Sequence, residues 1–163
     1  MSSTTAAANE TITDLDLVLK RVLNTSKEKI FKAWTTPELM KQWFVPKPWT
    51  LSKVETDVRA GGRSLVVMCD PEGNEYPNKG VYLEVVENEK IVFTDAYTEA
   101  WIPSEKPFFT GIILLEDASD GKTNYTAIAR HWKAEDREAH EKMGFHEGWG
   151  KCAEQLEELC QTL

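Results

Sequence analysis

The first third of the chain changes from the residue spacing of a strand to that of a helix. Apolar residues dominate 15–23, which predicts a first strand, and the polar residues 24–26 end it. Apolar side chains then recur every three to four positions in two short runs, which predicts two short helices. Ser26 is a suitable N-cap for the first helix, and Pro37 suits the first turn of the second.

The middle of the chain has the short apolar runs and the turn residues that are typical of antiparallel strands. Stretches rich in Gly, Asp, Asn and Ser separate these runs. Two longer stretches, 70–79 and 98–107, are expected to be loops, and the second carries Trp101. The expected strands are 51–59, 63–69, 80–86, 91–97, 108–116 and 123–132.

The C-terminal part predicts one long amphipathic helix from Glu135 to Thr162. At 100° per residue its apolar side chains fall within an arc of about 100°, and glutamates occupy the opposite side. At about 1.5 Å per residue, such a helix would be about 40 Å long and could cross a whole sheet. The apolar stripe consists of Phe145, Trp149, Cys152, Leu156, Leu159, Cys160 and Leu163.

The predicted order is therefore one strand, two short helices, about six further strands and a long helix. Strands and helices do not alternate, which argues against a parallel sheet and favours an α+β fold. The 163 residues fit one domain, and the sequence has neither repeats nor a linker. We expect a single domain over residues 14–163, preceded by a flexible tail over 1–13.

The composition is ordinary for a globular protein apart from six tryptophans. An aromatic side chain buries about 150–250 Å², so this set needs either a thick core or a cavity lined by rings. The net charge is −8, and Lys and Arg form no basic run that would neutralise phosphates. Nucleic acid and anionic membrane surfaces are therefore poor partners, and no apolar run is long enough for a membrane span.

The three cysteines and the N-terminus bear on the cellular location. Cys152 and Cys160 lie eight residues apart on the expected helix, a rise of about 12 Å that exceeds the reach of a disulfide. Free thiols suggest a reducing compartment. Residues 1–13 have neither the basic nor the apolar region of a signal peptide, so we expect a cytoplasmic protein.

Four strings of the sequence resemble, in the same order, the recurrent motifs of one branch of the START-like (SRPBCC) superfamily. They are residues 33–44 with the segments AWTTPEL and QWF, 58–62 (VRAGG), 92–94 (VFT) and 143–149 (MGFHEGW). The branch is named for its homology to the C-terminal domain of the activator of the ninety-kilodalton heat-shock chaperone's ATPase. The resemblance covers residues 15–163, nearly the whole chain.

This resemblance implies a helix-grip fold, in which a curved antiparallel sheet of six to seven strands holds the long C-terminal helix. It also implies a cavity between sheet and helix that binds a small hydrophobic or amphipathic ligand. The superfold hosts several functions, so two alternatives stand: an enzyme of the cyclase or hydrolase type that uses the same cavity, and a chaperone-activating interaction domain. We favour a binding protein over an enzyme, and we rank the chaperone partner last.

The candidate ligand-binding residues are mostly aromatic, because rigid rings give contact area at a small entropic cost. The rings around the second helix either seal the core or line the mouth of a pocket. Those on the last helix are buried, and their inner edges touch either protein or ligand. Trp101 is a lid, a surface ring or a dimer contact, and His146 either meets a polar ligand group or is solvated. The candidates are Trp43, Phe44, Trp49, Met68, Tyr97, Trp101, Phe145, His146 and Trp149.

The residues that carry metal or catalytic chemistry form no recognisable motif. His140 and His146 differ by about 240° around the helix, so they cannot share a metal ion as residues one turn apart do. Charged residues on strands could point inward, but a one-residue error in register would reverse every side chain. These residues are Arg59, Arg63, Glu84, Asp95 and Arg130. We expect no metal, no cofactor and no catalytic residue, and a monomer or homodimer whose partner is a small apolar molecule.

Overall fold

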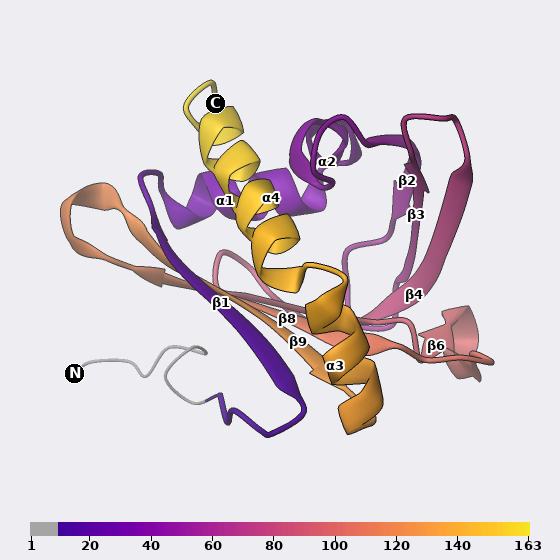
Figure 1. Cartoon of the computed structure of the whole chain (residues 1–163). Helices are drawn as coiled ribbons and strands as arrows, with labels where there is room; N and C mark the ends of the chain where they lie inside the picture. Colours follow the sequence, from indigo (N-terminus) through magenta and orange to yellow (C-terminus); the bar gives the residue numbers. More distant parts are fainter. Residues whose placement is uncertain (1–9) are drawn as a thin grey trace.

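A curved antiparallel sheet with helices on its concave side forms the fold, as the computed structural model shows for residues 10–163 (Figure 1). The strands are β1 (Asp16–Leu23), β2 (Thr50–Thr56), β3 (Arg63–Cys69), β4 (Glu75–Val86), β5 (Lys90–Thr94), β6 (Tyr97–Thr98), β7 (Ile102–Pro103), β8 (Phe109–Asp117) and β9 (Thr123–His131). The α-helices are α1 (Lys27–Thr35), α2 (Pro37–Trp43), α3 (Ala134–Lys142) and α4 (Phe145–Cys160), and short 3₁₀ turns cover Glu99–Trp101 and Ser119–Gly121.

Seven strands form the main sheet in the order β1-β9-β8-β5-β4-β3-β2, and each neighbouring pair is antiparallel. The first strand of the chain pairs with the last, so the N-terminal and C-terminal parts share one end of the sheet. The short strands β6 and β7 form a separate hairpin. The predicted α+β helix-grip arrangement and the antiparallel sheet are confirmed.

The predicted C-terminal helix is divided at Gly144. This residue has φ +96°, a left-handed conformation that an α-helix cannot continue through and that glycine adopts at little cost. Its N–H donates to the carbonyl of Glu141 at 3.1 Å, which closes α3 before α4 begins. The helix that lies on the sheet is therefore the 16-residue α4, about 24 Å long rather than about 40 Å.

Strand β4 begins five residues before its predicted start and takes in the second half of the expected loop 70–79. Tyr76 pairs with Met68, and Asn78 pairs with Val66, so these polar residues extend the hairpin with β3. Their side chains are exposed, and the residues therefore show no apolar run that would indicate a strand.

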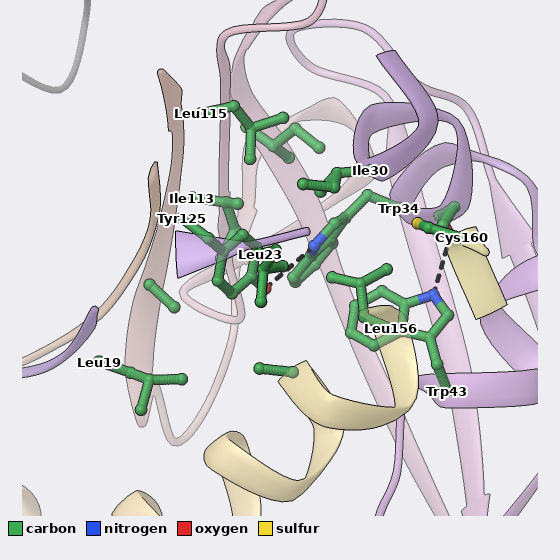
Figure 2. Packing of buried hydrophobic residues seen from close by; sticks show 14 of the residues in the cluster. Leu19, Leu23, Ile30, Trp34, Trp43, Ile113, Leu115, Tyr125, Leu156 and Cys160 are labelled. Carbon is green, nitrogen blue, oxygen red and sulfur yellow. Dashed lines mark hydrogen bonds between the residues drawn. The ribbon is translucent and has the colours of Figure 1, made fainter. Parts of the chain in front are cut away.

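Large side chains fill the space between the concave face and helices α1, α2 and α4 (Figure 2). Trp34 lies in the middle, where its Nε1 donates a hydrogen bond of 3.1 Å to the hydroxyl of Tyr125. The edge of its ring meets Trp43, whose own Nε1 donates to the carbonyl of Ala33 at 3.1 Å. Both indole N–H groups are thus satisfied in the interior, which lets two large rings be buried at little polar cost.

Gln155 ties α4 to the segment that joins α2 and β2. Its Nε2 donates to the carbonyls of Trp43 and Val45 at 3.0 and 2.8 Å, and its Oε1 accepts from the N–H of Lys47 at 3.0 Å. The side chain is 5% exposed and is satisfied at both ends. One buried amide therefore fixes the distance between the C-terminal helix and the second short helix.

The opposite, convex face of the sheet carries a smaller apolar cluster of Val92, Ile112, Leu114 and Ile128, with Val18 beside it. Glu10 forms ion pairs with Lys90 and Arg130, at 3.4 and 3.6 Å. Of the predicted tail, residues 10–13 are described and 1–9 lie outside the described residues. Among residues 10–163, no helix combines the length and the apolar character needed to cross a membrane.

Candidate functional site

A cleft of about 120 Å³ opens on the concave face over strands β3, β4 and β5. Helix α4 packs on β1, and α2 packs on β2, so the strands between them keep part of this face uncovered by helix. Phe44, which follows α2, and Phe109 of β8 contribute to the walls of the cleft. The residues that line the cleft are Phe44, Ser64, Val66, Met68, Asn78, Lys79, Gly80, Val81, Phe93, Thr94, Asp95 and Phe109.

Two glycines shape the strands around the cleft. A Cβ atom on Gly111 of β8 would lie 2.3 Å from Cζ of Phe93, so only glycine lets this ring lie against the strand. A Cβ atom on Gly80 would lie 2.2 Å from the carbonyl oxygen of Thr94, so β4 and β5 approach closely because Gly80 has no side chain. The space in the cleft therefore depends on the absence of two side chains.

Aromatic side chains hold the walls in place. The centroid of the Phe93 ring lies 5.8 Å from that of Trp34 and 6.2 Å from that of Phe109. The Phe44 ring meets Trp34 and Trp43 edge to face, at 5.5 and 5.3 Å. Since these rings rest on the main core, the apolar walls are formed before any ligand arrives.

Asp95 is the one acidic residue of this lining, and it is half-buried just after β5. Its Oδ1 accepts the backbone N–H groups of Phe108 at 2.9 Å and Phe109 at 3.3 Å, and its Oδ2 accepts that of Phe108 at 3.0 Å. Burial raises the pKa of the Asp95 carboxyl above its ordinary value, and the backbone hydrogen bonds offset only part of that effect. An acceptor with a perturbed pKa therefore lies beside apolar walls.

The structure brings two of the nine predicted ligand-binding residues, Phe44 and Met68, to this cleft. Trp43 and Phe145 are 2% and 1% exposed and belong to the main core. Trp149 is partly buried, and its ring centroid lies 5.8 Å from that of Phe109, so it supports a wall of the cleft from behind.

The other four predicted residues lie away from the cleft. Trp49 packs against Tyr76 at a centroid distance of 5.6 Å. Tyr97 and Trp101 contact each other on the separate hairpin, and Trp101 is 51% exposed. His146 is exposed, and its Nε2 lies 3.4 Å from a carboxylate oxygen of Glu141.

The sequence did not single out several residues of the cleft, among them Val66, Val81, Phe93 and Phe109. Ser64, Val66 and Met68 do alternate along β3, which is the signal of one strand face. That signal could not identify the concave face, because the neighbouring residues of β3 are equally apolar and are buried as well. Asp95 is the only one of the five charged strand residues considered above that reaches the cleft.

A second polar feature lies behind Phe109, where two histidines share a buried hydrogen bond. Nε2 of His131 on β9 lies 2.9 Å from Nδ1 of His140 on α3, and Nδ1 of His131 donates to the carbonyl of Leu15 at 2.9 Å. Rings of Phe108, Phe109, Phe145 and Trp149 surround His140. Burial, and then the charge on His131, lower the pKa of His140 to about 4.

This histidine pair was missed because its members are nine residues apart across a strand–helix junction. Their contact is not periodic in the sequence, so no spacing rule indicates it. Among residues 10–163, no group of three His, Cys, Asp or Glu side chains is close enough to hold a metal ion.

Comparisons with known proteins agree with this architecture. The family model described as "Activator of Hsp90 ATPase homolog 1-like protein" matches residues 24–161. A crystal structure of a protein from Nitrosomonas europaea is 45% identical, with a TM-score of 0.89 over 93% of this chain and 97% of that one. No curated protein matches the chain.

More distant structures share the fold alone. A protein from Mycobacterium smegmatis is 24% identical, with a TM-score of 0.75 over 89% of this chain and 90% of its own. A protein from Rhodobacter sphaeroides is 16% identical, with a TM-score of 0.80 over 93% of this chain and 95% of its own.

Proposed function

Because the chain belongs to the family of activator of Hsp90 ATPase homolog 1-like proteins, we propose that it binds a small apolar molecule in the cleft over β3, β4 and β5. The main support for this proposal is the cleft itself, whose walls are mainly apolar and pack against the main core. A concave apolar site with a few polar groups is the usual form of a small-molecule site.

The volume of the cleft limits what it holds. Drug-sized ligands occupy pockets of about 300–1,000 Å³, well above the 120 Å³ found here. An apolar cavity of about 150 Å³ binds benzene, so a space of this size suits one ring or the end of an apolar chain. The cleft opens to solvent, so a longer molecule can extend out of it.

The position of the cleft also refines the prediction from the sequence. The expected cavity lay between the sheet and the C-terminal helix, where Trp34, Phe145 and Leu156 now form a packed core. We place the ligand instead over β3, β4 and β5, in a cleft whose lining includes no residue of α4. The helix then acts as support for Phe109, through Trp149, rather than as a wall of the site.

An NMR titration tests this proposal directly. We expect toluene to shift the backbone amide signals of Gly80, Gly111 and their neighbours in a saturable way. The variant Met68→Trp should fill the cleft and weaken binding at least about ten-fold. Val22→Trp, on an exposed position of β1, is the control and should bind like the unaltered protein.

Two results would overturn the proposal. One is the absence of saturable shifts with toluene and with larger apolar rings such as naphthalene. The other is a set of shifts that lies elsewhere in the molecule and survives Met68→Trp. Native mass spectrometry of the purified protein, followed by extraction, would independently identify a molecule carried through purification.

A further inference from the structure

Asp95 carries a negative charge into the cleft without a cationic partner. Among the ion pairs of residues 10–163, none includes Asp95. Lys79 belongs to the lining, but in β4 it lies between Asn78 and Gly80, which pair with Val66 and Ser64 on the cleft side. None of these ion pairs joins the Lys79 ammonium to Asp95.

Asp16, in contrast, is a carboxylate with a cationic partner in the same chain. Arg130 donates to Asp16 through Nε at 2.8 Å and through a terminal nitrogen at 2.9 Å. Burial works to raise the pKa of Asp16, but the Arg130 guanidinium and the hydrogen bonds from Thr13 together outweigh it, and the pKa is lowered. At Asp95 the balance is reversed, and the pKa is raised. Asp95 therefore lacks the counter-charge that a buried carboxylate normally has.

The two oxygens of the Asp95 carboxylate are unequally used. The backbone N–H groups of Phe108 and Phe109 make three contacts with them, and the backbone N–H of Asp95 itself also acts on the carboxylate. Oδ2 takes only one of these contacts, the longer of the two from Phe108. A donor that enters the cleft can therefore bind Oδ2 without displacing the backbone.

We propose that the cleft selects a compound in which one apolar ring carries a short arm with a protonated amine. This inference rests on the proposed function and names its ligand class. The ring lies among Phe44, Val66, Phe93 and Phe109, and the ammonium supplies the counter-charge of Asp95. The small volume restricts the compound to a single ring, and the carboxylate excludes ligands that end in an anion.

A matched series of four probes distinguishes binding of an apolar ring from selection of an amine. Benzylamine, benzyl alcohol, toluene and benzoate share one ring and differ in the group on the arm. We expect benzylamine, protonated at pH 7, to bind about ten-fold or more tightly than toluene, as a hydrogen bond to a charged group allows. Benzoate should bind most weakly, and isothermal titration together with amide shifts at Gly80 and Gly111 should measure all four.

Two variants show whether Asp95 causes the preference. Asp95→Asn keeps an oxygen that can accept from the N–H groups of Phe108 and Phe109 but removes the charge, so it should abolish the advantage of benzylamine. Asp120→Asn is the control: it removes the same charge from an exposed turn whose left-handed backbone suits asparagine. It should leave the order of affinities unchanged, which excludes a general attraction to the acidic protein.

Each outcome has a distinct meaning. If toluene binds in the cleft but benzylamine gains nothing, the amine selection is wrong, and the apolar site stands. If none of the four probes binds there, both proposals fail. If Asp95→Asn does not fold, the order of the four probes on the unaltered protein still decides, because equal affinities or a preference for benzoate would overturn the inference.

Discussion

Acidification should destabilise this protein through His140, and a stability measurement against pH can isolate the effect. The folded protein holds His140 neutral among aromatic rings, with a pKa of about 4 instead of 6.5. In the unfolded chain the imidazole is exposed and takes up a proton near its ordinary pKa. Between these two values the unfolded state binds one more proton, so the free energy of unfolding falls as the pH falls.

The size of this effect follows from the two pKa values. One pH unit corresponds to 1.36 kcal/mol, so the interval from 6.5 to about 4 gives at most about 3 kcal/mol. The stabilisation is complete above pH 6.5, is lost progressively as the pH falls, and levels off below about pH 4. Such a loss is a large part of the roughly 5–15 kcal/mol that holds a typical domain together.

Urea denaturation at pH 7, 6, 5 and 4.5 should measure this, with the variant His140→Gln as reference. Glutamine retains a donor for Nε2 of His131 but does not titrate. Asp16 and Asp95 also have shifted pKa values, and their contributions cancel in the difference between the two proteins. We expect the unaltered protein to lose about 2 kcal/mol relative to the variant between pH 7 and pH 4.5.

A difference in unfolding free energy that stays constant between the two proteins over this pH range would contradict the low pKa of His140 in the folded state. A constant difference would mean that His140 has the same pKa in both states, as a solvated imidazole would. The near-ultraviolet circular dichroism of the aromatic rings around His140 offers a second measure, since protonation of a buried imidazole should disturb the rings that enclose it.

Three further substitutions test the cleft and the buried hydrogen bonds. In Gly111→Ala the new methyl group pushes the Phe93 ring into the cleft and costs about 1–3 kcal/mol in stability. Toluene should then bind at least about ten-fold more weakly in an NMR titration. Unchanged affinity would contradict this expectation. Tyr125→Phe leaves Nε1 of Trp34 without a hydrogen-bond acceptor in the core, so urea denaturation should show that the free energy of unfolding falls by about 1–3 kcal/mol. An unchanged free energy of unfolding would mean that the indole finds another acceptor. Gln155→Leu removes the hydrogen-bond partner of three backbone groups, so the free energy of unfolding should fall by about 2–5 kcal/mol. A smaller decrease than in Tyr125→Phe would contradict the proposed role of the Gln155 amide in holding α4 to the segment after α2.

The sequence predicted those parts of the fold that local spacing determines. Ser26 caps α1, where its hydroxyl accepts from the N–H of Lys29 at 3.3 Å, and Pro37 opens α2 as expected. The turn at Ser119–Gly121 closes the last hairpin. Each of these features depends on residues within one turn of one another, so periodicity and capping rules are enough to find them.

The break between α3 and α4 shows a limit of the same rules. Gly144 lies in a sequence whose apolar residues keep helical spacing on both sides, and isolated glycines do occur in helices. The positive φ at Gly144 ends α3, and α3 itself packs against β9 and β1. Apolar spacing alone therefore does not distinguish a glycine that continues a helix from one that ends it.

The cleft was harder to predict, because it depends on which strand face is concave and on where the helices stop. The six tryptophans suggested a thick core or a cavity lined by rings, and none of the six lines the cleft. Trp34 and Trp43 are in the core, Trp49 and Trp149 are partly buried outside the lining, and Trp101 and Trp132 are exposed.

The features that mark the cleft are instead two glycines and an unneutralised carboxylate. Gly80 and Gly111 remove side chains where backbone and ring must come close, and Asp95 keeps its charge where no cation of the described chain pairs with it. A core that needed only to be filled would favour an uncharged residue at position 95. Asp95 thus gives up solvation energy beside apolar walls, which is the pattern expected where a second molecule completes the contacts.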